Sequence, residues 1–355
     1  MKKKVLLLSF SLFISLVIVE IFIRSFVYKS ENYNYRNTFL LFEQGNVFQN
    51  IDDFFVYNPN SNITASTYYL EKNSFIEVNS YKIKTNNFGL VQAHDLIPEK
   101  ESILILGDSF TEGQGYGNWT DLLNYDSDKY QIINGGILGT GPQQFLRLEE
   151  YLSKKILIKK VILLYVGDDF RRDLYNHGED RLNCLKNYKN CNGSEIFYGF
   201  PLTTKDPQNF LIYLREKRFE NNKEYLSFKR IRRSIKRKLS NLYVINIPIS
   251  FLRATFYKSK NEKILKNFNA IEKLISKYDN DIHFVNIAQK NEILFNKKSY
   301  ETIYANKFIA NKTKNIHQCN LDNNLDFFFK YDQHPNEKGY KQISSCISKI
   351  LKKIL

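Results

Sequence analysis

Three short segments carry residue types that could do chemistry together, although they lie far apart along the 355-residue chain. The first, Gly107–Gly113, has the sequence GDSFTEG and contains Ser109. The second, Asn134–Gly141, is rich in glycine, and the third holds Asp332 and His334 two positions apart. A serine becomes a nucleophile when a histidine takes its proton and a third group orients that histidine. The three segments therefore predict acyl transfer through a covalent serine intermediate.

The chemistry of each segment suggests its part in such a site. Ser109, on a tight strand-to-helix turn, is the candidate nucleophile, and His334 is its candidate general base. Asp332 could accept a hydrogen bond from the imidazole, which would fix the ring tautomer and stabilise its charged form. Glycines let the backbone approach a ligand, and a backbone N–H aimed at a developing oxyanion is the usual device of acyl transfer. Alone, a glycine run or a D-x-H pair is a weak signal.

Short apolar runs alternate with amphipathic patterns around these segments. Ser102–Leu106 is almost wholly apolar, which predicts a strand buried on both faces of a parallel sheet. Further strands are predicted at Tyr130–Asn134, Lys160–Val166 and Asp281–Ala288, and helices at Pro142–Lys154, Asn261–Tyr278 and Glu337–Leu355. The alternation predicts an α/β fold with a doubly wound parallel sheet of about five strands and helices on both faces. Its ligand site should lie at the carboxyl ends of the strands.

Two regions fall outside this alternation. Residues 26–101 carry many β-branched and aromatic residues, and Ser74–Leu90 ends in the turn signal Asn86–Gly89, so we predict a small β-rich preface. Residues from about 170 to 260 are too many for a single crossover and predict an insertion into a main domain at 102–355. The basic cluster Lys229–Lys238 in this insertion is either a solvated helix face or a contact for anionic lipid or acidic glycan.

The N-terminus predicts export. Lys2, Lys3 and Lys4 precede an apolar run over Val5–Val19, and such lysines stay cytoplasmic. No small-residue cleavage pattern follows, so residues 1–25 predict an uncleaved, single-pass membrane anchor rather than a cleaved signal peptide. The rest of the chain would then lie on the periplasmic or extracellular side. The formal charge of +15 favours an anionic partner, and export argues against nucleic acid.

Four cysteines, an even number, suit a compartment where disulfides persist. Cys184 and Cys191 are close in sequence, and a bridge between them would close a short loop. That pairing leaves Cys319 with Cys346, although the sequence alone does not fix the connectivity. The rival interpretation is a metal site, but the spacings match no zinc pattern. We therefore expect no metal and no other cofactor.

The order of the three chemical segments resembles the SGNH/GDSL hydrolase family over about Ser102–Leu355, apart from the insertion. The resemblance implies a flavodoxin-like three-layer fold with Ser109 as nucleophile and with Asp332 and His334 as the orienting acid and the base. It also implies that the backbone N–H of Gly139 binds the oxyanion. The short Asp–His spacing and the N-terminal region resemble the membrane-anchored branch that modifies polysaccharide O-acetyl groups.

One position departs from the family pattern. Its third block carries G-N-D with an Asn that donates to the oxyanion, and here Asp168 stands in that place. An ionised Asp has no proton to donate. Burial or nearby Asp169 could keep Asp168 protonated, or Asp168 could be a structural carboxylate with Arg171 or Arg172 neutralising the site. The third interpretation is an enzyme that has lost its activity.

These observations predict a serine esterase that acts on ester groups, with O-acetyl of a cell-envelope glycan implied by the resemblance. A sugar hydroxyl in place of water as acceptor would make the protein an O-acyltransferase. A glycan-binding module on an inactive hydrolase scaffold is the hypothesis from another class. The partner is accordingly an acylated glycan or a small ester.

The remaining histidines and the one tryptophan have structural interpretations. His283 lies in an apolar strand and is expected in the core, whereas His94, His177 and His317 are expected on the surface or in loops. Trp119 could line an acyl pocket, but packing beneath the helix after Ser109 is the favoured prediction.

Overall fold

The computed structural model describes residues 2–22, 37–197, 200–223, 262–294, 298–319, 321 and 324–355. The chain divides into two compact units, Met1–Tyr33 with Arg215–Asn261 and Asn34–Leu214 with Glu262–Leu355. Every residue singled out above for catalysis lies in the second unit. The basic cluster Lys229–Lys238 lies outside the described residues.

Helix α1 (Lys2–Phe22) includes the apolar run expected near the N-terminus. In the portion of the chain that the structure describes, however, no helix has the length and apolarity needed to cross a membrane. The predicted membrane helix is therefore not supported.

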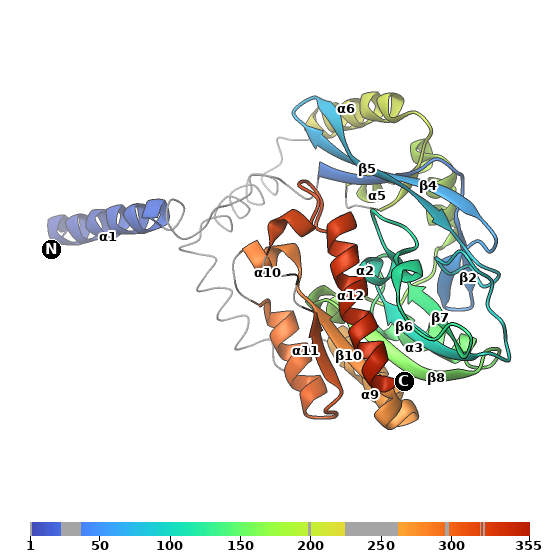
Figure 1. Cartoon of the computed structure of the whole chain (residues 1–355). Coiled ribbons are helices and arrows are strands. Elements are labelled where there is room, and N and C mark those ends of the chain that lie inside the picture. Colours follow the sequence, from blue (N-terminus) through green and yellow to red (C-terminus); the bar gives the residue numbers. More distant parts are fainter. Residues whose placement is uncertain are drawn as a thin grey trace. The chain divides into compact units, whose positions relative to one another are not determined.

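A parallel five-stranded sheet forms the centre of the second unit, in the order β11-β10-β8-β6-β7 (Figure 1). Its strands are β6 (Glu101–Gly107), β7 (Tyr130–Gly136), β8 (Ile158–Tyr165), β10 (Ile282–Ile287) and β11 (Ile316–Cys319). The apolar runs fold this way because both faces are covered, and Ile103–Leu106 are fully buried. The predicted doubly wound α/β sheet is confirmed.

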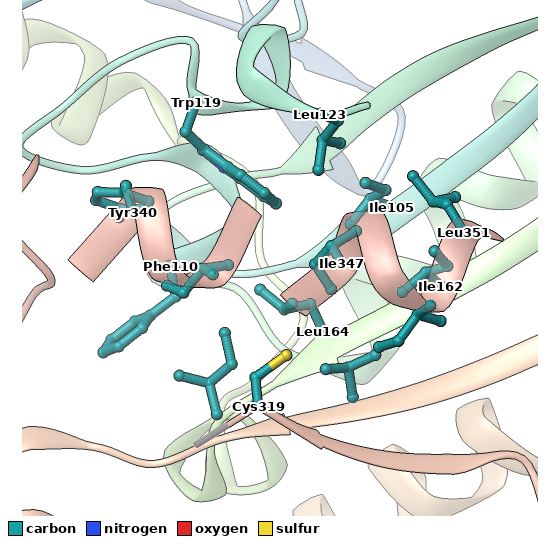
Figure 2. Close-up of a cluster of buried hydrophobic side chains, with 14 of the residues drawn as sticks. Ile105, Phe110, Trp119, Leu123, Ile162, Leu164, Cys319, Tyr340, Ile347 and Leu351 are labelled. Atoms are coloured by element: carbon teal, nitrogen blue, oxygen red, sulfur yellow. The ribbon is translucent and has the colours of Figure 1, made fainter. Parts of the chain in front are cut away.

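Helices pack against this sheet. Helix α12 (Glu337–Ile354) sets Ile347 and Leu351 against Ile105 and Ile162 of the sheet in one apolar cluster (Figure 2). Helices α3 (Pro142–Leu152) and α9 (Glu262–Tyr278) contact β6 and β10 and pack on each other. The other short helices are α2 (Ser109–Glu112), α10 (Lys290–Leu294), α11 (Tyr300–Ala310), and the 3-10 turns η3 (Trp119–Leu122), η4 (Gly167–Arg171), η6 (Asp279–Asp281) and η7 (Leu325–Phe327).

The region before the main sheet is rich in β structure, as the composition indicated. It holds β1 (Thr38–Phe42), β2 (Phe48–Ile51), β3 (Phe54–Tyr57), β4 (Asn62–Glu71) and β5 (Ser74–Lys84). Strands β5, β4 and β1 form a second sheet, and β2 pairs with β3. Strand β9 (Leu202–Thr203), from the predicted insertion, extends the second sheet in the order β5-β4-β1-β9. The turn expected at Asn86–Gly89 is present. Position 89 requires glycine because its φ is 74° and because a side chain there would collide with the carbonyl of Tyr57.

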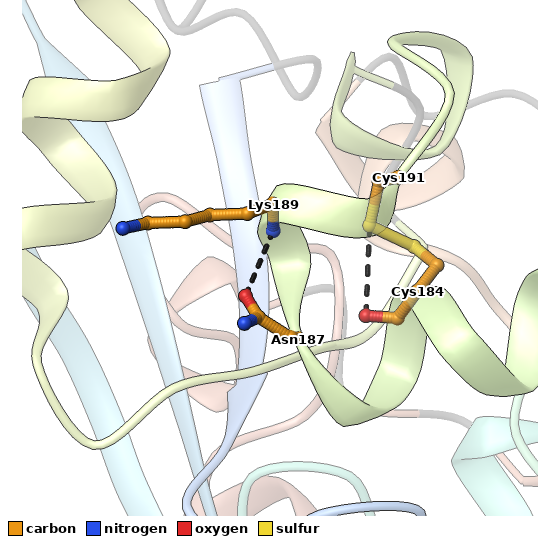
Figure 3. The surroundings of a disulfide bond; sticks show 4 residues. All are labelled: Cys184, Asn187, Lys189 and Cys191. Atoms are coloured by element: carbon orange, nitrogen blue, oxygen red, sulfur yellow. Dashed lines mark hydrogen bonds between the residues drawn. A yellow bond between two sulfur atoms is a disulfide. The ribbon is translucent and has the colours of Figure 1, made fainter.

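Two disulfides join Cys184 to Cys191 and Cys319 to Cys346, as the sequence indicated. The first reaches from Cys184 within α4 (Glu179–Lys186) to Cys191, and in the chain between them Asn187 accepts a hydrogen bond from the backbone of Lys189 (Figure 3). The rest of the described insertion forms η5 (Tyr188–Asn190), α5 (Ser194–Phe197) and α6 (Pro207–Lys223).

Candidate active site

The three chemical segments meet at the carboxyl end of the central sheet. Ser109 begins α2 directly after β6, and the glycine-rich segment follows β7, which neighbours β6. Asp332 and His334 come from the loop before α12. Parallel strands end at a common edge, so segments far apart in sequence converge there.

Ser109, His334 and Asp332 form a continuous hydrogen-bonded chain. Ser109 Oγ lies 2.8 Å from His334 Nε2, and His334 Nδ1 lies 2.8 Å from Asp332 Oδ1. Asp332 accepts only from a protonated Nδ1, which leaves Nε2 of the neutral ring to accept the serine proton. Ser109 is 5% exposed and Asp332 6%, so the chain of bonds is largely shielded from water.

Close packing around Gly107 shapes the turn that carries Ser109. The Oδ1 atom of Asp108 accepts from Phe110 N at 2.9 Å and so caps α2. Gly107 lies so close to Thr111 and to the Leu164 carbonyl that a Cβ would not fit. Gly113 then ends the helix with φ 102°. No hydrogen bond to the backbone N–H of Ser109 is found among the described residues.

Hydrogen bonds from a buried lysine hold the loop that carries the base. Lys290 is 1% exposed, and its Nζ donates to the carbonyls of Phe329 and Lys330 at 2.7 and 2.8 Å. Phe329 N donates to the carbonyl of His334 at 3.2 Å. Asn336 caps α12 through Lys338 N, so the loop is fixed where the helix begins.

The charge of Asp332 is stabilised by its neighbours. Burial alone would raise its pKa, but the imidazole of His334 and the backbone N–H groups of Gln333 and His334 together hold the pKa below its ordinary value. Asp332 therefore stays ionised and can stabilise a charged imidazole ring.

Glu112 supports the glycine-rich loop from α2. Its Oε2 accepts from Leu138 N at 2.6 Å, directly before Gly139, which has φ 72°. Glu112 is 1% exposed, and burial raises its pKa to about 8, against the opposing effects of Tyr57 and the Leu138 N–H. In the part of the chain that the structure covers, nothing accepts a hydrogen bond from Gly139 N. This N–H therefore stays available beside the nucleophile's helix.

Asp168 lies against a surface arginine. Its Oδ1 accepts from Arg171 Nη2 at 2.6 Å, its side chain is 34% exposed, and Arg171 also approaches Glu301 at 3.6 Å. This is the geometry expected for a structural carboxylate neutralised by Arg171. The adjacent Asp169 is fully buried and accepts from Val166 N at 3.1 Å.

Arg172 joins the first two of the three chemical segments to the segment after β8, a role that the sequence alone did not indicate. Its Nη1 lies 2.8 Å from Asp108 Oδ2, 2.9 Å from the Thr140 carbonyl and 3.1 Å from Asp169 Oδ1. Asp108 Oδ2 is also 3.3 Å from Ser109 Oγ. One guanidinium thus links the nucleophile's turn, the glycine-rich loop and the segment after β8.

Outside the site, the structural interpretations are mostly confirmed. His283 is buried in β10, His94 is exposed, and Trp119 is fully buried with its indole N–H donating to the Thr111 carbonyl. His177 lies in a loop between η4 and α4, as predicted, but it is buried rather than on the surface: it is 2% exposed and its ring lies 4.2 Å from that of Phe55.

Burial and the positive charge of Arg181 lower the pKa of His177 to about 3, so the ring is neutral in its aromatic surroundings. The prediction for His317 is also wrong in part, since it lies half-buried in β11 beside His283.

No family model matches the chain, and no curated protein does. Among solved structures, it is similar to a lipase/acylhydrolase from Enterococcus faecalis at 12% identity, covering 71% of this chain and 96% of that one with a TM-score of 0.35. It is also similar to a GDSL-like lipase from Bacteroides thetaiotaomicron at 12% identity, covering 72% of this chain and 89% of that one with a TM-score of 0.32. A G-D-S-L family lipolytic protein from Veillonella parvula is 12% identical, with 71% of this chain and 99% of that one covered and a TM-score of 0.33. No residue role here rests on these similarities.

Proposed function

We propose that this protein is a serine esterase that works through an acyl-serine intermediate. The observation that carries the proposal is the unbroken chain from Ser109 Oγ through His334 to Asp332, with both links at 2.8 Å. A nucleophile, its base and an orienting carboxylate are the parts that acyl transfer requires.

In the first half-reaction, His334 Nε2 takes the hydroxyl proton while Ser109 Oγ attacks the ester carbonyl carbon. The carbonyl electron pair moves to oxygen, and the free N–H groups of Ser109 and Gly139 stabilise the resulting oxyanion. The tetrahedral intermediate collapses, His334 gives its proton to the departing alkoxide, and an acyl-serine remains. Asp332 stabilises the imidazolium between these two proton transfers.

In the second half-reaction, an acceptor hydroxyl gives its proton to His334 and attacks the acyl-serine. Water as acceptor yields an acid and an esterase, whereas a sugar hydroxyl yields an O-acyltransferase. Exclusion of water and binding of the acceptor decide between these outcomes, and the triad geometry is the same for both.

The substrate that we propose is an O-acetylated glycan of the cell envelope. The resemblance of the motifs to the polysaccharide-modifying branch supports this choice. A groove of about 570 Å³ on β4 and β5 supports it further, because beside the apolar Ile63 and Ile83 its lining includes polar side chains that can bind sugar hydroxyls and acidic groups: Lys82, Lys84, Asn62 and Asn118. Asn118 lies in the loop that follows the nucleophile's helix.

The test is hydrolysis of p-nitrophenyl acetate by the purified protein and four variants. Ser109→Ala and His334→Ala should lower kcat/KM at least about 10³-fold, because each removes a group required for attack. Exposed Ser127 and His94 supply the matched controls Ser127→Ala and His94→Ala, which should hydrolyse the ester like the wild type.

Absence of turnover in the wild type, together with binding of an acetylated glycan, would instead support the glycan-binding module. For an active protein, release of free acetate from such a glycan supports the esterase. Appearance of the acetyl group on a second glycan supports the acyltransferase.

We also propose that the protein is exported and held at the membrane by its N-terminal region. The three lysines before the apolar run support this orientation, and the two disulfides suit an oxidising compartment. Extraction of cell membranes at alkaline pH tests it, since an anchored protein stays with the membrane pellet. Recovery of the intact chain in the soluble fraction would overturn the anchor.

A further inference from the structure

An oxyanion needs preorganised donors, and the segment after β8 offers no obvious one. The position that resembles the donor Asn of the third family block holds Asp168, whose carboxylate accepts from Arg171 at the surface. A carboxylate in that role would repel the developing negative charge. Loss of one oxyanion donor typically costs about 10²–10³ in rate. A working enzyme therefore requires another donor on this side of the site.

Arg172 contacts both segments that are proposed to supply the backbone donors for the oxyanion. Its Nη1 and Ser109 Oγ both contact the same oxygen, Asp108 Oδ2, at 2.8 and 3.3 Å. The same nitrogen donates to the Thr140 carbonyl, which is one residue beyond Gly139. The guanidinium thus contacts both backbone segments whose N–H groups are proposed to bind the oxyanion.

The rest of this guanidinium is uncommitted. Every hydrogen bond and ion pair of the Arg172 side chain within the described ranges uses Nη1, so Nε and Nη2 keep three N–H bonds for a ligand. The side chain is 25% exposed, which leaves it reachable from solvent. Nη1 anchors the group, and its planar geometry fixes where the other nitrogens point.

The local charge balance keeps the guanidinium positive toward a substrate. Asp108 and Asp169 both lie within ion-pair distance, and both are buried. Burial and the charge of Asp108 raise the pKa of Asp169, while Arg172 opposes that rise. A raised pKa lowers the average negative charge on Asp169, so this carboxyl offsets less of the guanidinium charge.

We propose that Arg172 is a catalytic residue that donates a charge-assisted hydrogen bond to the oxyanion, in place of the amide that Asp168 lacks. This inference rests on the proposed esterase function. No proton is transferred: as the bond from Ser109 Oγ to the carbonyl carbon forms, the carbonyl electron pair moves to oxygen and is held by Nε or Nη2 together with the N–H groups of Ser109 and Gly139.

The test compares Arg172→Lys with the wild type. Lysine keeps the positive charge for Asp108 but loses the fork of additional N–H groups. We expect kcat for p-nitrophenyl acetate to fall about 10–100-fold with KM changed less than about twofold, because the lost bond forms only in the transition state. Rates are expressed per site titrated with a fluorophosphonate, so unfolded protein does not enter the comparison.

Inhibition by a boronic acid provides a second measurement, one that would not change if Arg172 had a purely structural role. Boron forms a tetrahedral anion on Ser109, and its inhibition constant should rise in Arg172→Lys by about the factor lost in kcat. Arg147→Lys is the matched control, because Arg147 also pairs with two carboxylates, Asp53 and Glu150, but on exposed α3. It should leave both values unchanged.

If Arg172→Lys does not fold, Arg172→Gly provides a second test. Millimolar guanidinium ion should restore part of the kcat of Arg172→Gly, whereas sodium at equal ionic strength should not. Wild-type kcat in Arg172→Lys, or a fall in kcat with unchanged boronate affinity, would overturn the inference. Failure of the fluorophosphonate to label wild-type Ser109 would instead overturn the esterase function itself.

Discussion

At the scale of single residues, Ser109 has two acceptors within reach of its hydroxyl. His334 Nε2 at 2.8 Å is nearer than Asp108 Oδ2 at 3.3 Å. Asp108 is further occupied by the Phe110 N–H and by Arg172. The hydroxyl proton is therefore directed toward the base, and the geometry needs no rearrangement before attack.

Glu112 gives a residue-scale prediction about stability. Its pKa rises from 4.5 to about 8 in the folded protein. A raised folded-state pKa means that its contribution to stability is complete below pH 4.5 and is lost as the pH rises toward 8. The free energy of unfolding should fall across this window by up to about 1.4 kcal/mol per pH unit.

The Glu112→Gln variant should remove this dependence, since an amide oxygen can still accept from Leu138 N. Urea unfolding at several pH values measures the effect, and Glu337→Gln on an exposed surface is the control. An unchanged pH slope in Glu112→Gln would show that burial does not keep this carboxyl protonated.

Sequence patterns identified the three triad side chains because each sits in a short motif with its own chemistry. Lys290 and the bridging contacts of Arg172, which the sequence predicted only as a possible neutralising charge, were missed for the opposite reason. Lys290 binds carbonyls about 40 positions away, and Arg172 binds groups 64 and 32 positions away. Nothing local in the sequence distinguishes these two residues from ordinary surface cations.

At the scale of elements, the four longer strands of the central sheet were predictable because each contains a short, mostly apolar run. Strand β11 was not, since its four residues include His317 and Gln318 and only Cys319 is buried. It is stabilised by pairing with β10 and by the disulfide from Cys319 to Cys346 on α12. Tertiary context, rather than local pattern, makes this segment a strand.

The two disulfides should contribute unequally to stability. The Cys319–Cys346 bridge spans 27 positions and encloses the loop with Asp332 and His334, while Cys184–Cys191 spans 7. Loop-closure entropy predicts losses of about 3.5 kcal/mol for the double variant Cys319→Ser/Cys346→Ser and about 2.4 kcal/mol for Cys184→Ser/Cys191→Ser. Urea unfolding of both variants tests this order, and a larger loss from the shorter loop would contradict it.

At the scale of the whole molecule, the β-rich preface does more than precede the catalytic domain. The Tyr69 ring of β4 stacks on Tyr331 at 4.4 Å and 8°, and Thr38 Oγ1 donates to the Tyr331 carbonyl at 2.9 Å. Tyr331 directly precedes Asp332. The preface sheet therefore supports the loop that carries the base, over 293 positions of sequence in the case of Thr38. The sequence predicts the preface but not this role, because a contact at this separation leaves no local pattern.

Removal of the Tyr69 ring should lower the reaction rate, because this ring supports the loop that carries His334. Such a ring pair is worth about 0.5–1.5 kcal/mol, so Tyr69→Leu should lower kcat about 2- to 10-fold with little change in KM. The neighbouring Tyr68 packs against Phe75 instead, and Tyr68→Leu is the matched control. Steady-state kinetics of both variants decide the point, and equal effects would exclude a specific role for the stack.

The central claim is that the fold joins the Ser109 hydroxyl to the His334 imidazole as one nucleophile. The direct measurement is mass spectrometry of the chain after reaction with a fluorophosphonate. The account predicts one covalent adduct per chain on Ser109, and no adduct on that residue in His334→Ala over the same time. Equal labelling of Ser109 in wild type and His334→Ala, or no labelling of the folded wild type, would contradict it.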